Sequence, residues 1–155
     1  MTIKIENLGV IERAVKARLE KMEPEFKSAV EAEKEAVITR SKSGIDVAGK
    51  NFKAYSDNEK WKGKNWKDTR RAEGFQTAYV DLTYSGDMFK AMKVAFRKEG
   101  FKFLATIFFG DQKQSQKAKG HQTGQLGKNK FEPRKFFGLS QSQREAIVSK
   151  LRNVK

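Results

Sequence analysis

The clearest structural pattern in this chain is Met92-Lys93-Val94-Ala95-Phe96-Arg97-Lys98-Glu99-Gly100-Phe101-Lys102-Phe103-Leu104-Ala105-Thr106-Ile107-Phe108-Phe109. Apolar and polar side chains alternate over residues 92–97, residues 98–100 have the composition of a turn, and Gly110 ends the second apolar run. This pattern predicts a β-hairpin. Because residues 104–109 are nearly all apolar, we expect both faces of the returning strand to be covered.

Upstream of the hairpin, apolar side chains recur three or four residues apart and predict one long helix within residues 1–40. The apolar stripe consists of Leu8, Ile11, Val15, Leu19, Met22, Phe26, Val30 and Val37. Pro24 lies inside it, which predicts either a kink or a division into two helices. We expect the helix to cover one face of the hairpin. At roughly 45 Å if unbroken, it is long enough to project and pack against another subunit instead.

The segments around the hairpin complete the predicted architecture. Residues 85–87 predict the start of a short helix, with Ser85 or Asp87 as its N-cap. Residues 131–137 predict a short edge strand, because Pro133 cannot donate to a sheet ladder. Ser140 and Gln143 form a capping-box pattern ahead of a C-terminal helix over about residues 141–153. The order predicts a single α+β domain over residues 1–155: a long N-terminal helix packed on a small antiparallel sheet, long loops and a C-terminal helix.

Two long segments have no sustained period and predict loops. Residues 41–74 predict an extended loop with spaced aromatic side chains, namely Phe52, Tyr55, Trp61 and Trp66. Such side chains are frequent anchors of protein interfaces, and together with the lysines of residues 60–67 they also suit single-stranded nucleic acid. Residues 110–130 predict a mobile basic loop that holds His121, which we expect to make a backbone or interface hydrogen bond at the surface.

The basic excess is uneven along the 155 residues, whose formal net charge is +14. Residues 1–40 hold 8 basic and 8 acidic side chains, whereas residues 41–135 hold 21 basic and 10 acidic ones. A basic body of this kind meets either nucleic acid or acidic protein neighbours. Loops with aromatic anchors suit contacts between subunits, and a hairpin can extend its sheet into a neighbour by edge pairing.

Composition also limits the kinds of chemical site and membrane segment that the chain can form. The chain has no Cys and one His, which argues against disulfides, a thiol nucleophile and a cysteine-ligated zinc site. No apolar run approaches the roughly 18 residues of a membrane span, and residues 1–6 lack a signal-peptide pattern, so we expect synthesis in a cytoplasm.

No catalytic pattern emerges from the sequence. Gly44 and Gly49 are not followed by the Lys-Ser/Thr of a phosphate-binding loop, and no nucleophile or carboxylate stands in a recognisable pattern with His121. The aspartates are scattered singly. We expect no enzyme, no metal and no cofactor.

Four short patterns follow one another along the chain. They are Ile38-Thr39-Arg40-Ser41 with Gly44, Gly49 and Phe52; Leu82-Thr83-Tyr84-Ser85-Gly86-Asp87-Met88; Gly120-His121-Gln122-Thr123-Gly124; and Pro133-Arg134-Lys135-Phe136-Phe137-Gly138-Leu139-Ser140. In order and spacing they resemble the Mu-type phage virion morphogenesis proteins, or tail completion proteins, which are related to the neck proteins of other long-tailed phages. The motif residues are Gly44, Gly49, Ser85, Gly86, His121, Gly124, Pro133, Arg134 and Phe136.

The resemblance implies a non-enzymatic structural protein of the virion, assembled in the host cytoplasm. Such a protein forms a homo-oligomeric ring, a hexamer or a dodecamer, at the head–tail junction or the head-proximal end of the tail. It implies neck, connector or tail-tube proteins as neighbours, non-specific contact with DNA in the channel, and no membrane. It adds His121 and Arg134 to the interface candidates Phe52, Tyr55, Trp61 and Trp66. The alternatives are a small basic nucleic-acid-binding protein and a phage nuclease or other enzyme.

Overall fold

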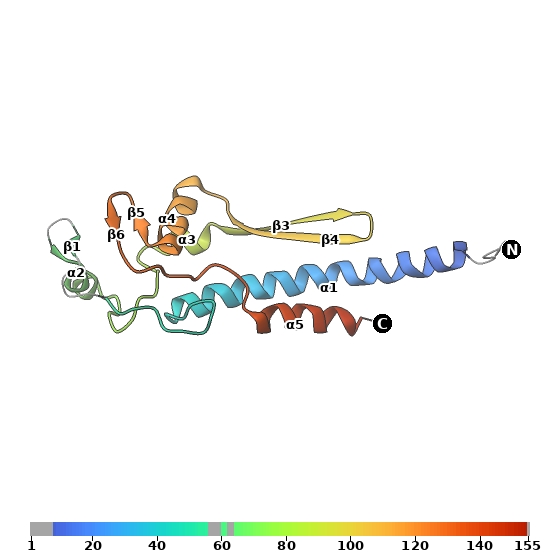
Figure 1. Cartoon of the computed structure of the whole chain (residues 1–155), viewed down its shortest axis with the longest axis horizontal. Helices are drawn as coiled ribbons and strands as arrows, with labels where there is room; N and C mark the ends of the chain where they lie inside the picture. Colours follow the sequence, from blue (N-terminus) through green and yellow to red (C-terminus); the bar gives the residue numbers. More distant parts are fainter. Residues whose placement is uncertain (1–7, 56–59, 62–63, 155) are drawn as a thin grey trace.

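The computed structural model describes residues 8–55, 60–61 and 64–154. It is elongated, with short elements gathered at one end and a long helix beside a hairpin extending toward the other (Figure 1). We call the short elements of residues 43–91 and 110–139, with the C-terminal end of the long helix, the body. The rest of the long helix, the hairpin and the C-terminal helix form the arm. The predicted α+β architecture is confirmed.

The long helix α1 spans Leu8–Lys42 and runs through Pro24 without a break. Its 35 residues correspond to about 52 Å. Proline leaves the carbonyl of Glu20 without its helical donor. Pro24 lies on the exposed side of the helix, where water can satisfy that carbonyl. Because α1 is continuous through Pro24, the predicted division into two helices is wrong.

The hairpin consists of β3, Met92–Glu99, and β4, Lys102–Phe109, paired antiparallel with Phe96 opposite Ala105. It is a sheet of two strands. The inner face, defined by Phe96, Phe103 and their neighbours, lies against α1. The ring of Phe26 lies 6.2 Å from that of Phe96 and 5.8 Å from that of Phe103, centroid to centroid. The expected packing of the N-terminal helix on the hairpin is confirmed.

The C-terminal helix α5, Gln141–Arg152, lies along another side of α1 (Figure 1). The predicted capping box is present, with Ser140 and Gln143 bonding each other's backbone N–H groups. Arg40, near the end of α1, donates to the side chain of Gln143 at 2.6 Å and to the carbonyl of Phe136 at 2.9 Å. These bonds fix the start of α5 to α1.

The hydrophobic core lies in the body and reaches the first residue of β3. Its buried members come from α1, the loops, the short elements and the start of β3, and are Val37, Ile38, Phe52, Tyr55, Val80, Met88, Phe89, Met92, Ala118 and Phe136. The short elements are α2 (Trp66–Ala72), α3 (Asp87–Lys90) and α4 (Gln112–Thr123). Two small ladders add β1 (Lys60–Trp61) with β2 (Lys64–Asn65), and β5 (Gln125–Leu126) with β6 (Asn129–Lys130).

The expected mobile loop over residues 110–130 is wrong, because most of it is α4, β5 and β6. Asp111 caps α4 through a bond from the N–H of Gln114 at 2.8 Å, and Gly124 ends it in the left-handed region. Both are ordinary helix signals. The helix was missed because its buried face is Gln114, Ala118 and Gly120, which gives almost no apolar stripe.

Three smaller predictions also fail. The extended loop of residues 41–74 contains α2, which begins after Asn65 caps the N–H groups of Lys67 and Asp68. Residues 131–137 form no strand, and the nearby pairing is confined to β5 and β6. The N-cap of α3 is Gly86, without a side-chain cap, instead of Ser85 or Asp87. In residues 131–137 the backbone bonds the end of α4 instead, because the N–H of Phe131 donates to the carbonyl of Gly124 and that of Arg134 to the carbonyl of His121.

Candidate assembly surfaces

The first candidate surface is the N-terminal segment of α1, residues 9–18, which is exposed throughout. Ile11 is 56% exposed and Val15 is 42% exposed. This segment extends past the turn of the hairpin (Figure 1). The apolar stripe of α1 thus continues beyond the part of the sheet that covers it.

The second candidate surface is the outer face of the hairpin, opposite α1. Along β4 it carries Leu104, Thr106 and Phe108, all exposed, with Leu104 at 40% and Phe108 at 39%. Lys93 of β3 pairs with Phe108 in the sheet register and is also exposed. The expectation that both faces of this strand are covered is wrong, because among the described residues one helix covers one face and nothing covers the other.

The edges of the hairpin are a third feature. Within the described residues, β3 and β4 pair only with each other, so each strand has one edge with no ladder partner. An open strand edge presents a row of N–H and C=O groups that another chain can pair with. Phe101, in the turn, is 73% exposed. Exposed apolar side chains and open edges therefore coincide in the arm.

The aromatic residues expected at an interface lie elsewhere. Phe52 and Tyr55 are buried in the core, and burial raises the pKa of Tyr55 to about 12. Trp66 opens α2 and is half-buried, its ring 4.9 Å from that of Tyr84. The side chain of Trp61 lies outside what the structure describes. Phe52 and Tyr55 are therefore not available as the interface anchors that the sequence predicts, because their side chains stabilise the subunit's own interior.

His121 and Arg134 form a contact within the body. His121 lies in the last turn of α4, half-buried, with its ring 5.7 Å from that of Phe131. The Nη1 of Arg134 lies 3.3 Å from the Nδ1 of His121. Because a guanidinium only donates, Nδ1 accepts, which requires a neutral ring. Burial, followed by the positive charges of Arg134 and Lys117, lowers the pKa of His121 to about 4. The expected surface position in a mobile loop is wrong.

The motif residues shape the body. Gly44 follows α1 with φ of +76°, and a Cβ there would lie 2.7 Å from Cδ2 of Tyr79. Gly124 ends α4 with φ of +75°, and a Cβ there would lie 2.3 Å from the carbonyl oxygen of Phe131 and 3.0 Å from Cδ of Pro133. A side chain is therefore excluded at both positions. Phe136 is fully buried against the rings of Phe89 and Phe109.

The remaining motif residues are also structural. Gly49 lies in a turn with φ of +81°, where its N–H donates to the carbonyl of Asp46. Gly86 precedes α3, and Ser85 accepts a long bond from the N–H of Asp87. The structure thus gathers most motif residues in the body and places none of them on the exposed surfaces of the arm.

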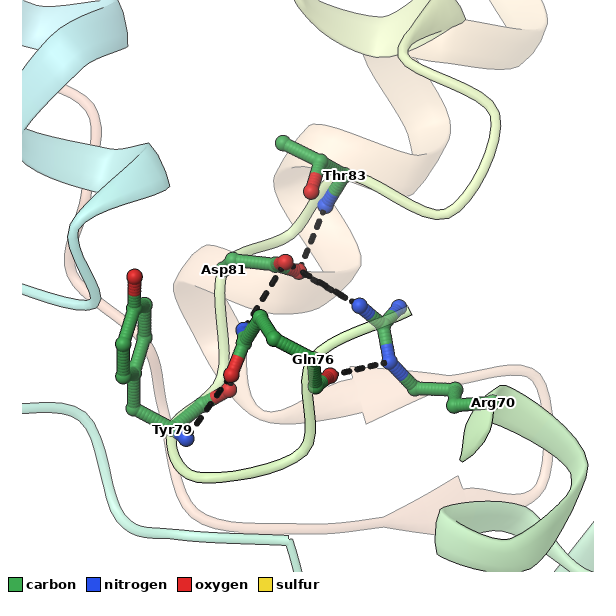
Figure 2. Close-up of polar contacts among 5 residues, drawn as sticks. All are labelled: Arg70, Gln76, Tyr79, Asp81 and Thr83. Atoms are coloured by element: carbon green, nitrogen blue, oxygen red, sulfur yellow. Dashed lines mark hydrogen bonds and ion pairs between the residues drawn. The ribbon is translucent and has the colours of Figure 1, made fainter. Parts of the chain in front are cut away.

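One buried ion pair has the charge and burial expected of a chemical site. Arg70 of α2 is 1% exposed, and its Nη2 lies 3.0 Å from both carboxylate oxygens of Asp81. Asp81 also accepts from the side chain of Gln76 at 2.9 Å and from the N–H of Thr83 at 3.1 Å (Figure 2). Gln76 in turn bonds both backbone groups of Tyr79.

The geometry of this pair indicates a structural role. Burial alone would raise the pKa of Asp81, but the hydrogen bonds from Gln76 and Thr83 and the charge of Arg70 outweigh it and lower the pKa. The guanidinium carbon also lies 5.0 Å from the ring centroids of both Tyr55 and Phe75. The carboxylate has donors on both oxygens and is buried, so the pair holds α2 and residues 75–83 onto the core.

Sequence reasoning missed the exposed apolar residues of the arm. Ile11, Val15, Leu104 and Phe108 fit the patterns of an amphipathic helix and a buried strand, which indicate core positions. Comparing the length of the hairpin with that of α1 could have identified the exposed part of the helix. Eight residues of strand reach about 27 Å, about half the length of α1, so part of the helix stripe extends beyond the sheet.

Within the described residues, no three His, Cys, Asp or Glu side chains lie where they could hold a metal ion. In the same part of the chain, none of the helices has the length and apolar content needed to cross a bilayer. No family model, curated protein or solved structure matches this chain. Function is therefore inferred from the surfaces of the chain and from its sequence patterns.

Proposed function

We propose that this chain is a structural virion protein of a tailed phage, which forms a ring at the head–tail junction or the head-proximal end of the tail. In this role it completes the tail or joins it to the head and turns over no substrate. Copies of the same chain in a hexamer or dodecamer, and neck, connector or tail-tube proteins above and below, are its partners. The order and spacing of the four sequence patterns around Gly44, Ser85, His121 and Pro133 support this role.

The observation that carries the proposal is the arm. A two-stranded sheet is marginally stable alone, and here both edges are exposed together with one face, on which Leu104 and Phe108 stand among charged side chains. The helix beside it exposes Ile11 and Val15. Apolar surfaces of this kind, next to open strand edges, are typical of chains that become covered on assembly. A subunit built around a covered body and an uncovered arm suits a ring.

The charge fits this role in one of two ways. A net charge of +14 can face DNA in the channel or acidic protein neighbours. Phosphate contacts accumulate in affinity, so a lining that binds DNA strongly would slow its exit. We therefore assign much of the charge to contacts with acidic neighbours. DNA contact in the channel remains non-specific in this proposal.

The test is the assembly state of the full chain, measured by light scattering after size exclusion at low and high salt, with electron micrographs of each large species. A closed ring with a central hole is the expected result, and its symmetry would separate a hexamer from a dodecamer. A monomer that binds DNA tightly, with affinity falling steeply with salt, would overturn the proposal in favour of a nucleic-acid-binding protein.

A further inference from the structure

The apolar stripe of α1 has a covered part and an uncovered part. Ile11, Val15, Leu19, Met22 and Phe26 follow one another four, four, three and four residues apart, so they lie along one side of the helix. Phe26 packs on the inner face of the hairpin, and Leu19 and Met22 are half-buried. Ile11 and Val15 continue the same line into the exposed segment. The uncovered part thus extends an interface that the chain already makes with its own sheet.

The outer face of the hairpin matches that segment in size and character. From Leu104 through Thr106 to Phe108 it offers an exposed row about 14 Å long. The ten residues of α1 from position 9 to position 18 span about 15 Å. Lys93 and Arg97 of β3 lie opposite Phe108 and Leu104, and Glu12 stands next to Ile11 on the helix segment. Glu12 can therefore face one of these cations, but both surfaces carry more basic than acidic side chains, so the match between them is one of apolar side chains and length.

These two surfaces cannot meet within one chain. α1 is continuous from Leu8 to Lys42 and lies against the inner face, so its N-terminal segment cannot fold back over the hairpin. Their complementarity is available only to a second copy. Because the helix segment and the sheet face are different surfaces, the contact is head-to-tail. Repeated by rotation, such a contact closes into a ring or continues as a filament.

We infer that residues 9–18 of α1 in one copy dock on the outer face of β3 and β4 in the next, with Ile11 and Val15 against Leu104, Thr106 and Phe108. The hairpin then lies between two helices, its own α1 on the inner face and the neighbour's α1 on the outer face. This inference rests on the proposed ring and names the surface that builds it.

The test uses disulfide cross-linking of the full chain, which has no cysteine of its own. The variant with both Val15→Cys and Thr106→Cys is oxidised and analysed by denaturing, non-reducing electrophoresis. The expected result is a ladder of dimer, trimer and higher species, because each copy holds both halves of the contact. Mixing the two single variants should give a dimer and nothing larger.

The matched control replaces Arg13 by Cys together with Thr106→Cys. Arg13 lies in the same exposed segment, two residues from Val15 and so on another side of the helix. No ladder is expected from this pair. A control that cross-links as efficiently as the Val15 pair would show random collision and overturn the inference. Self-linked dimers from either single variant alone would also overturn it, because they indicate a symmetric contact.

Micrographs of the same samples separate this inference from the proposed function. Closed rings without the Val15–Thr106 cross-link would support the proposed ring and overturn the proposed docking surface. A cross-linked ladder with open filaments and no rings would support the docking surface and count against the ring. If the chain neither cross-links nor assembles at the highest attainable concentration, both fail.

Discussion

The body and the arm of this molecule differ in how completely one chain covers its apolar residues. In the body, Phe136 and Val80 are almost completely buried, and even the charged pair of Arg70 and Asp81 has partners for its charges. In the arm, Ile11 and Phe108 remain exposed although they lie on elements that carry a regular apolar pattern. The chain therefore encloses the apolar residues of the body with its own elements, whereas it leaves apolar side chains of the arm exposed, and our proposal assigns these to contact with another copy.

The largest expected difference in stability is between removing an aromatic ring from the body and removing one from the arm. Phe136→Ala should lower the free energy of unfolding by about 3–5 kcal/mol, because it removes a fully buried ring from the core. Phe108→Ala should cost about 1–2 kcal/mol in the monomer, because 39% of that residue is already exposed. Urea unfolding of both variants measures this. Equal losses would mean that the outer face of the hairpin is covered within the subunit.

A second contrast compares two arginines that each pair with a carboxylate. Arg70→Ala should cost about 3–5 kcal/mol, because it leaves Asp81 buried without its cation. Arg97→Ala, which removes an exposed pair with Glu99, should cost between 0 and about 1 kcal/mol. Thermal unfolding at fixed pH compares the two. A small loss for Arg70→Ala would contradict the structural role of the buried pair.

Replacing Pro24 tests whether α1 is continuous along the arm. Pro24→Ala should raise the free energy of unfolding by up to about 3 kcal/mol, because it restores a donor for the carbonyl of Glu20 and removes the ring clash. Lys16→Ala, at another exposed position of the same helix, should stay within about 0.5 kcal/mol. Circular dichroism during urea unfolding measures both. A loss of stability in Pro24→Ala would contradict a continuous α1.

Mild acid should destabilise the body through His121. The folded state binds this proton with a pKa of about 4, and the unfolded chain binds it near 6.5. Between these two pKa values the unfolded chain holds more protons than the folded state. The free energy of unfolding is therefore largest above about pH 6.5 and falls as the pH drops. The expected loss from about pH 7 to about pH 5 is about 2 kcal/mol. His121→Asn should remove this slope, which urea unfolding at both pH values checks. An unchanged slope in the variant would place the titrating group elsewhere.

The smallest expected effect on stability is in the N-terminal segment of α1. Val15→Ala should change the free energy of unfolding of the monomer by less than about 0.5 kcal/mol, because the side chain is exposed and Ala suits a helix. The same change should weaken self-association about tenfold, since it removes apolar area from the proposed contact. Sedimentation measures association. A large loss of stability would mean that this segment is covered in the monomer.

Local patterns were sufficient for the regular elements with a strong period. The spacing from Leu8 to Val37 predicts α1, the apolar runs around residues 98–100 predict β3 and β4, and Ser140 with Gln143 predicts the start of α5. These elements have their signals within a few residues. α4 and α2 have weak apolar periodicity, and their positions depend on contacts such as Gly124 with Phe131 and Arg70 with Asp81. Local reasoning missed them for that reason.

The candidate surfaces likewise depend partly on local sequence and partly on how distant elements pack. The helical stripe and the hairpin follow from local sequence, as the composition and charge do, because periodicity and turn residues act over a few positions. The packing of the elements sets which apolar residues are covered. It buried Phe52 and Tyr55 and left Ile11, Val15, Leu104 and Phe108 exposed, because burial depends on which distant elements meet, and here α1 is longer than the sheet that covers it and lies on one face of that sheet.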